Sequence, residues 1–526
     1  MIKSISKILC LSIALVGFCV GGAAQTVRGT VVDSSNEPLP GASVILEGTR
    51  TGTTADAAGR FTLQAREGQV MVVSFIGFSD KRVPVTRQAE YVIVLETDVN
   101  ILDDVVVVGY DTQKKVNLTG SVSSVSTDEF TRRPISQVSA ALQGLAPGVT
   151  VTTGGGAPGD ENINIQIRGI GTFGGSSCAP LVLIDGVEGS LSSLDATQVE
   201  QISILKDAAS SAIYGNRAAN GVILVTTKRG VKGRSVVTYR GYVGWQKPVV
   251  YPSVASAEEY MLLSQRAALN DGSATIYTDE YIENYYKNHY LDPDAFPIID
   301  WQKRLLTGDG FTHNHVLTLS AGGDNIRVLT SIGYLKQDAI IKFSNYERYN
   351  IRNNMDIKLS EKLNLKVDIN GTYSIRRTAI SQSGAFSFMN VKDPLMLAQW
   401  SDGSYAPFTG GTINPLPMFE QGLGGDSRSQ SALLRGAITL AFKPFKWLTF
   451  ETKAVPTLSL SKSHVFHDIV NYHSDPYGSI SPISNIEYNY LDESDHVTYS
   501  GLYQATAMVS KSFGDHNFKL LGGASY

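Results

Sequence analysis

The sequence predicts a mainly β protein in three parts: an N-terminal β-sandwich, an α+β domain, and an incomplete antiparallel β-barrel of the transmembrane kind. Three observations support this fold class. Short apolar runs separated by turn residues fill residues 25–97. Strands and short helical pieces alternate in residues 116–230. From residue 231 to 526, long segments alternate between apolar and polar residues, which is typical of strands with two different environments.

Composition limits the classes of function. The chain has 526 residues, enough for three or more domains. Its net charge of -4 argues against nucleic acid as a partner, because nucleic-acid binding requires a basic excess. The 50 Gly and 24 Tyr, with only 18% charged residues, favour many short strands and turns over helix bundles.

Residues 1–24 have the features of a secretory signal peptide. Lipid attachment at Cys19 is disfavoured, because Phe18 stands where a small residue is needed. After residue 24 there is no run of 18 apolar residues, so insertion into a membrane requires a barrel. The basic start, the apolar core and the cleavage site of the signal are Lys3 and Lys7, Ile8–Val20, and Gly22–Ala24.

Residues 25–97 are predicted to form the β-sandwich. Their strands are rich in β-branched residues and are bounded by turn residues. The stretch Gly29–Leu63 resembles the carboxypeptidase-regulatory-like domain. We interpret this part as an accessory domain without catalysis. The predicted strands are Val27–Val32, Ala42–Leu46, Gly59–Leu63, Val70–Phe75 and Tyr91–Leu95.

Catalytic, metal and cofactor sites are not expected. A zinc carboxypeptidase needs a His-x-x-Glu pair, and none of the eight His residues is followed by Glu at that spacing. Cys178 is the single Cys after the signal, and no His precedes His289, so we interpret Cys178 as a small apolar filler. No Walker sequence is present, so the chain is not expected to consume ATP.

Residues 98–115 form a linker with an unusual apolar strand. Val105–Val108 reads VVVV, follows two aspartates and is followed by polar sequence. On residue type alone it would be an ordinary buried strand. Its place between two domains favours another interpretation, because an unpaired apolar strand is an aggregation hazard unless a partner pairs with it. We expect a partner protein to add a strand here.

Residues 116–230 are predicted to form a compact α+β domain. Within it, Gly169–Gly174 matches the dinucleotide fingerprint and Glu188 lies about twenty residues on. The fingerprint requires a helix directly after the glycines, and here the sequence continues through Gly175–Pro180 into a strand, so nucleotide binding is disfavoured. The predicted elements are strands Asn162–Arg168, Leu181–Ile184, Val199–Leu205 and Gly221–Thr227, and a helix over Asp207–Tyr214.

Several strings together carry a family resemblance. They are VVVVGY from Val105, DGV from Asp185, LKDAASSAIYG from Leu205 and RAANGVILVTTKRG from Arg217, in this order. Together they resemble the coupling box and plug of a SusC/RagA-type TonB-dependent outer-membrane transporter. The pair Cys178-Ala179 departs from the polar residues that the family more often has, which leaves the shape of that loop open.

The resemblance implies partners and site residues. TonB, energised by its inner-membrane complex, would pair with the linker strand and pull on the plug. A SusD-like lipoprotein would help to capture oligosaccharide or peptide cargo. By position, Arg168, Thr172 and Phe173 in the Gly-rich apex are candidates for substrate contact, and Arg168 is equally a candidate for a structural ion pair. The TonB-binding residues would be Asp103, Asp104, Val105, Val106, Val107, Val108, Gly109 and Tyr110, here called the coupling segment.

Residues 231–526 are predicted to be the first part of the barrel, in contact with outer-membrane lipid. Strands of about ten residues with alternating short turns and long loops are typical of such barrels. A large soluble β protein is the alternative, which the signal and the plug disfavour. In the clearest strand, one parity carries Leu363, Leu365, Val367, Ile369, Tyr373 and Ile375, and the other Asn364, Lys366, Asp368, Asn370, Ser374 and Arg376.

Three long insertions are expected to be extracellular loops: Gln246–Gly310, Arg377–Ser429 and Ser461–Asp495, the first with a helix over Ala257–Ala268. Their aromatic residues either stack on sugars or pack within the loops and at the membrane interface, and the second fate is the commoner one. His313 and His315 form a potential metal pair, but they lie on an alternating strand and we interpret them as structural. The aromatic residues in question are Tyr285, Tyr286, Trp301 and Trp400.

About nine strands are predicted after Val236. Outer-membrane transporters of this class have about 22 strands, and a sheet with open edges leaves backbone groups unpaired in lipid. We therefore expect the chain to be part of a longer protein or a truncated product; a smaller complete barrel would not hold the plug. The predicted function is TonB-dependent import of nutrient oligomers across the outer membrane. The alternatives are a surface-binding adhesin or sensor, and a truncated transporter without activity.

Overall fold

The computed structural model describes residues 25–33, 37–49, 51–75, 78, 80–86, 90–95, 105–108, 111–114, 122–127, 137–154, 156–160, 163–171, 178–250, 252–380, 382–408, 413–484, 486–513 and 516–526. The chain divides into two compact units. The first contains the N-terminal sandwich, and the second contains the α+β domain together with a long antiparallel sheet, here called the wall.

The N-terminal unit is a sandwich of two sheets, as predicted. One sheet has the order β4-β1-β7 and the other β3-β2-β5-β6. Alternate residues point inward, as in β4, where Phe61, Leu63 and Ala65 are buried. Two strands, β3 and β6, were not predicted, because they are short and mostly polar. The strands are β1 (Gln25–Val32), β2 (Ser43–Leu46), β3 (Gly52–Thr54), β4 (Arg60–Ala65), β5 (Val70–Ser74), β6 (Lys81–Pro84) and β7 (Glu90–Val94).

Two short strands of the linker, β8 (Val105–Val108) and β9 (Asp111–Lys114), form a two-stranded sheet. The strand predicted at Val105–Val108 is therefore present.

The α+β domain has a five-stranded sheet in the order β10-β15-β16-β13-β14 and a separate hairpin, β11-β12. Its core is aliphatic, with Leu194, Val199, Ile202 and Ile204 fully buried. β15 has the predicted bounds. The strands are β10 (Val122–Ser126), β11 (Val149–Thr153), β12 (Ile163–Ile167), β13 (Leu181–Ile184), β14 (Val187–Glu188), β15 (Val199–Leu205) and β16 (Val222–Thr227).

The helix predicted over Asp207–Tyr214 is divided. It begins as α5 (Ala208–Ser211), with Asp207 accepting a bond from the Ser210 N–H at 2.8 Å, and continues as the 3-10 segment η4 (Ala212–Ala218). Gly215 breaks the helical path with a φ of 70°. Other short helices are α4 (Val138–Ala141), η2 (Leu191–Ser193) and η3 (Ala196–Gln198).

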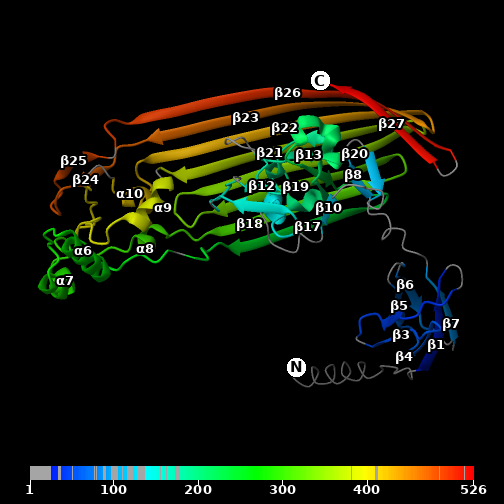
Figure 1. Cartoon of the computed structure of the whole chain (residues 1–526), viewed down its shortest axis with the longest axis horizontal. Coiled ribbons are helices and arrows are strands. Elements are labelled where there is room, and N and C mark those ends of the chain that lie inside the picture. Colours follow the sequence, from blue (N-terminus) through cyan, green and yellow to red (C-terminus); the bar gives the residue numbers. More distant parts are fainter. Residues whose placement is uncertain are drawn as a thin grey trace, which may run out of the picture. The chain divides into compact units, whose positions relative to one another are not determined.

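The wall is a nine-stranded antiparallel sheet in which the strands run side by side in chain order (Figure 1). Several strands are longer than the ten residues expected, and β26 reaches 24. Short turns join alternate strands, as at residues 361–362 between β20 and β21. The strands are β17 (Gly233–Trp245), β18 (Phe311–Gly322), β19 (Ile326–Asp338), β20 (Asn345–Ser360), β21 (Leu363–Ala379), β22 (Gly425–Phe445), β23 (Leu448–His467), β26 (Tyr490–Phe513) and β27 (His516–Ser525).

The two faces of the wall differ as the alternation predicted. On β20, Arg348, Asn350, Arg352 and Asn354 are buried against the α+β domain, which lies on this inner face. The residues between them, such as Tyr349 and Ile351, point to the outer face and are exposed. Polar residues inside and apolar residues outside reverse the arrangement of a soluble protein, and this pattern is typical of transmembrane barrels.

Aromatic residues on the outer face gather in two rows. The loop-side row crosses four neighbouring strands, in which directly opposed residues place His315, Tyr334, Tyr349 and Tyr373 side by side. The Tyr334 and Tyr349 ring centres are 4.9 Å apart. The turn-side row lies near the short turns, where Phe442 is opposite Phe450 on the next strand. It also contains Phe513 and Phe518, whose ring centres are 6.0 Å apart.

The long loops gather at one end of the wall (Figure 1). They contain α6 (Ala257–Asp271), α7 (Asp279–Leu291), α8 (Trp301–Leu305), α9 (Gln382–Val391), α10 (Leu416–Glu420) and the hairpin of β24 (Asn471–His473) and β25 (Ile480–Ser484). Trp301 and Leu305 pack with residues of the second and third loops in one apolar core. Among the described residues, no helix is long and apolar enough to cross a membrane.

Candidate functional site

The α+β domain is held against the inner face of the wall by paired charges. Asp185, in the turn after β13, lies 3.3 Å from an Arg352 nitrogen on β20. Asp195 lies 3.8 Å from Arg348, which precedes Arg352 on the same strand and points to the same face. Asp195 also caps η3 by accepting the Thr197 N–H at 2.9 Å, so a single side chain orders the domain and contacts the wall.

In a third group of ion pairs the charges are reversed: the cation belongs to the α+β domain and the anions belong to the wall. Arg229 follows the last strand of the α+β domain, and its guanidinium donates to Asp356 at 3.0 Å and to Asp368 at 2.8 Å. Burial opposes the charge of Arg229, but the hydrogen bond and negative charge of Asp368, with the charges of Asp185 and Asp356, raise its pKa above the ordinary value. Arg229 therefore stays charged and anchors the end of the domain between two wall strands.

Further hydrogen bonds complete this interface. The Asn354 amide donates to the Thr227 hydroxyl at 2.9 Å and to the Lys228 carbonyl at 2.7 Å. The Lys453 ammonium donates to the Asp185 carbonyl at 2.7 Å. The apolar contact across the interface is small: Val187 packs with three wall residues, Ala437, Val455 and the partly buried Leu502. When a polar interface opens, water replaces its hydrogen bonds, so each bond contributes only about 1 kcal/mol to holding the two sides together. The α+β domain and the wall therefore meet mainly through polar groups, with one small shared apolar cluster.

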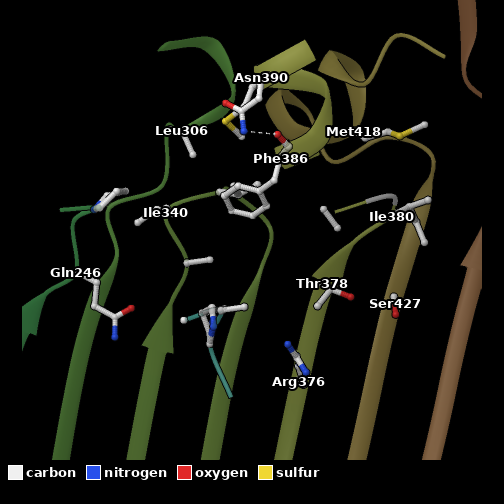
Figure 2. Close-up of a pocket in the computed structure, with 18 of the residues that line it drawn as sticks. Gln246, Leu306, Ile340, Arg376, Thr378, Ile380, Phe386, Asn390, Met418 and Ser427 are labelled. Atoms are coloured by element: carbon white, nitrogen blue, oxygen red, sulfur yellow. Dashed lines mark hydrogen bonds between the residues drawn. The ribbon is translucent and has the colours of Figure 1, made fainter. Parts of the chain in front are cut away.

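A cavity of about 1340 Å³ lies where the wall strands meet the loops. Its sides come from the loop-side ends of β17, β21, β22, β23 and β26, and from α9 and α10. The segment Gly156–Pro158 of the α+β domain also lines it. Figure 2 shows Arg376 and Thr378 along one strand and Ser427 on the next, with Phe386 and Asn390 of α9 above them.

The α+β domain fits the wall closely beside this cavity. The Gly159 N–H donates to the Gln337 side-chain carbonyl at 3.3 Å. Gly159 has a φ of +64°, and a Cβ at this position would overlap the ring of Tyr346 on β20. Glycine therefore meets two requirements here, a left-handed backbone and contact with an aromatic ring.

The structure places only some of the predicted site residues. Arg168 ends β12 with a φ of 60°, is exposed, and is not part of the lining of the cavity. Its N–H donates to the Gly148 carbonyl at 2.9 Å. Thr172 and Phe173 lie outside the described residues. Their contact with substrate, and that of Arg168, stays a prediction.

The coupling segment is described in part. Val105, Val106, Val107 and Val108 form β8, whereas Asp103, Asp104, Gly109 and Tyr110 lie outside the described residues. The binding of TonB to this segment stays a prediction.

Sequence reasoning missed the segment Gly156–Pro158, which lines the cavity. The available signal was the run GGGAPG from Gly154, a turn-forming stretch between two strands.

Around the fingerprint-like glycines, the described residues Gly169–Gly171 and Cys178–Pro180 are not helical, and β13 follows. The helix that a dinucleotide site needs is therefore not formed by these residues.

His313 and His315 lie on the outer face of β18. Their ring centres are 5.2 Å apart, and the Nδ1 atom of His315 is 2.6 Å from the Tyr239 hydroxyl. The described residues contain no group of three potential metal ligands. Tyr285 and Trp301 are buried in the loops, so their predicted fate as packing residues is the one observed.

Comparison with known proteins agrees with this architecture. Residues 114–222 match the TonB-dependent Receptor Plug Domain, and residues 27–107 match the CarboxypepD_reg-like domain.

Similar proteins show to which branch of the TonB-dependent receptors the chain belongs. TonB-dependent receptor P26 of Formosa agariphila is 38% identical over 68% of this chain, and TonB-dependent receptor SusC of Bacteroides thetaiotaomicron is 34% identical over 72%. A solved structure of the RagAB peptide importer in its open-open state matches 80% of this chain and 48% of that chain, with a TM-score of 0.65 and 24% identity. The chain is a member of the SusC/RagA-type TonB-dependent receptors.

The matched regions cover 35% of P26 and 37% of SusC, so each match spans well under two thirds of the relative's own length. Both relatives carry the name TonB-dependent receptor.

Proposed function

We propose that the chain belongs to a transporter that imports nutrient oligomers, glycan or peptide fragments, across the outer membrane in a TonB-dependent manner. The observation that carries this proposal is the polar interface between plug and wall. Asp185 and Asp195 on the plug meet buried arginines of the wall, and little apolar surface is shared. Such an interface holds the plug at rest and releases it under a pull, because water replaces its hydrogen bonds.

The outer face supports a place in the membrane. Tyr373 in the loop-side row and Leu363, which is opposite Phe442 in the turn-side row, are separated by about ten residues of β21. At about 3.3 Å per residue and a strand tilt of about 40°, the two rows are ~25 Å apart across the membrane. This is the height of the apolar band of an outer-membrane barrel. The long loops then face outward, and the N-terminal sandwich is periplasmic.

TonB supplies the pull in this proposal. Its strand would pair with the coupling segment, Asp103–Tyr110, of which Val105–Val108 is already extended. Backbone hydrogen bonds of an added strand transmit force along the chain to the plug, and the inner-membrane proton gradient supplies the energy. A SusD-like lipoprotein is the proposed partner for cargo capture at the loops, since the chain resembles receptors of the SusC and RagA type.

The test is a proline substitution in the coupling segment. Val106→Pro removes a backbone donor and fixes φ, so strand addition fails and uptake of the cargo is expected to stop. Val106→Thr is the matched control, because it keeps the donor and the β-branched shape. Uptake of labelled oligomers is measured in cells with equal amounts of receptor in the outer membrane. Unchanged uptake by Val106→Pro, with cargo still bound, would make the chain a surface-binding protein rather than a TonB-driven importer.

A further inference from the structure

We propose that the cavity at the loop end of the wall binds an oligopeptide with aliphatic side chains and a free carboxylate. This inference rests on the proposed function and narrows its cargo. It follows from three features: the residue types in the lining, the state of Arg376, and the fate of the loop aromatics.

The lining is mainly aliphatic. Ten of its residues are Val, Leu, Ile or Met, and three are Trp, Phe or Tyr. Sugars are polar on all edges and bind where aromatic rings stack on their faces. Branched aliphatic side chains, such as those of Leu306, Ile340 and Ile380, instead match the side chains of an apolar peptide. A volume of about 1340 Å³ is large enough for several residues.

The charges in the lining have one sign. Lys247 and Arg376 are its Lys and Arg residues, and it contains no Asp or Glu. The Arg376 Nε is shielded from solvent and has no hydrogen-bond partner among the described residues. Because this nitrogen is shielded, a ligand in the cavity would meet the guanidinium at its other nitrogens, and a carboxylate is the acceptor that fits this group. The lining therefore presents two cationic side chains and no acidic one beside an apolar surface, which favours an anionic group on the ligand.

The strand geometry separates Arg376 from its neighbour. Arg377 follows it on β21 and points to the opposite face, where it lies 3.7 Å from Glu347. Arg377 is not part of the lining of the cavity. The two arginines are neighbours on β21, but only Arg376 faces the proposed ligand.

Two of the loop aromatics, Tyr285 and Trp301, are not available to stack on a sugar. Tyr285 and Trp301 are 2% and 3% exposed, and their polar atoms are used within the loops. The Tyr285 hydroxyl donates to the Pro297 carbonyl at 2.8 Å, and the Trp301 indole donates to the Asp393 carbonyl at 3.0 Å. Both rings are therefore held in the packing of the loops and do not line the cavity.

The test compares a carboxylate with its amide. Acetyl-Leu-Ala-Val-Leu with a free C-terminus and the same peptide with a C-terminal amide are titrated into the receptor purified from outer membranes, with binding measured by calorimetry. The free acid is expected to bind about tenfold more tightly than the amide. Arg376→Gln is expected to reduce this ratio to about twofold or less, and Arg377→Gln to leave it unchanged. Heat-modifiability of each variant confirms that it is folded.

A second arm identifies the source of the anion. An oligomer of galacturonic acid and a neutral maltooligosaccharide are titrated in the same way. Weaker binding of both glycans than of the free-acid peptide supports the proposal. Equal binding of acid and amide, tighter binding of the uronic acid oligomer, or no binding of the peptide overturns it. If a glycan is bound and its uptake still depends on Val106, the inference fails while the proposed function stands.

Discussion

Single residues fix how the plug is held. Arg348 and Arg352 are almost completely buried on the inner face of the wall, and each meets one aspartate of the plug. A buried ion pair contributes little over a well-packed apolar pair, but the removal of one partner leaves the other charge buried and alone. The two pairs therefore determine where the plug sits and make it sensitive to the loss of either carboxylate.

The first prediction concerns Asp185. Asp185→Asn keeps the left-handed backbone, a φ of 49° that Asn tolerates, and removes the charge opposite Arg352. The plug is expected to lose about 2–3 kcal/mol of stability, because the arginine stays buried without an anion. Denaturant-dependent proteolysis of the plug in detergent measures this.

The matched control for that change is Glu188→Gln, three residues along the chain. Glu188 pairs with Arg217 at 2.7 Å, but both side chains are more than half exposed. Exposed pairs contribute about 0–1 kcal/mol, so the plug should be nearly unaffected. Equal losses for the two variants would mean that the buried pair does not hold the plug.

The second prediction concerns Gly159. Gly159→Ala is expected to lower plug stability by more than Gly156→Ala, since both have a positive φ but only the first brings a Cβ into the ring of Tyr346. The backbone term of about 1 kcal/mol is common to both, and the difference isolates the steric overlap. The same proteolysis assay applies. Tyr346→Ala in the Gly159→Ala background should restore part of the loss; no restoration would place the strain elsewhere.

At the scale of elements, the sequence predicts what strict alternation determines. The outer and inner parities of β20 and β21, and the bounds of β15, follow from residue type alone. The change from α5 to the 3-10 segment η4 after Ser211 was not predicted. The helices α7 to α10 were not predicted either, because loop helices depend on contacts between distant segments. Arg376 was predicted to lie on the polar parity, but its unpartnered Nε depends on the packing around it.

The third prediction concerns the second loop. Asn414 is fully buried, and its amide donates to the carbonyls of Ala398 and Ala406 at 2.7 and 2.9 Å. Its side-chain carbonyl accepts the Leu416 N–H at 3.1 Å. Asn414→Ala leaves the buried Ala406 carbonyl and Leu416 N–H without these partners, whereas the Ala398 carbonyl still accepts the Ala406 N–H at 3.1 Å, and the change is expected to cost the loop about 2–4 kcal/mol. Amide hydrogen exchange over residues 393–424 measures this.

Asn390→Ala is the control within the same loop. Asn390 is exposed, and its amide donates to the Phe386 carbonyl at 2.9 Å within α9. Its loss should change exchange only within that helix. If Asn414→Ala leaves the protection of residues 393–424 unchanged, the apolar core around Trp301 is sufficient to order the loop.

At the scale of the whole molecule, the two faces of the wall require different surroundings. Its inner face contacts a polar plug, and its outer face carries an apolar band between two aromatic rows. Neither face alone indicates a membrane, since each occurs in soluble sheets. The combination of buried polar residues inside and exposed apolar residues outside is stable only where lipid replaces water at the outer face.

The last prediction follows from this arrangement. Ile438 lies on the outer face of β22 between the two rows and is 51% exposed, whereas Ile480 is 66% exposed but lies in a loop strand outside the band. Arg at the bilayer midplane costs about 2–4 kcal/mol, so Ile438→Arg should reduce the heat-modifiable fraction in lipid vesicles. Ile480→Arg should have no such effect, although its side chain is the more exposed. If both behave alike, exposure in water rather than depth in lipid governs the outer face, and the band does not contact the membrane.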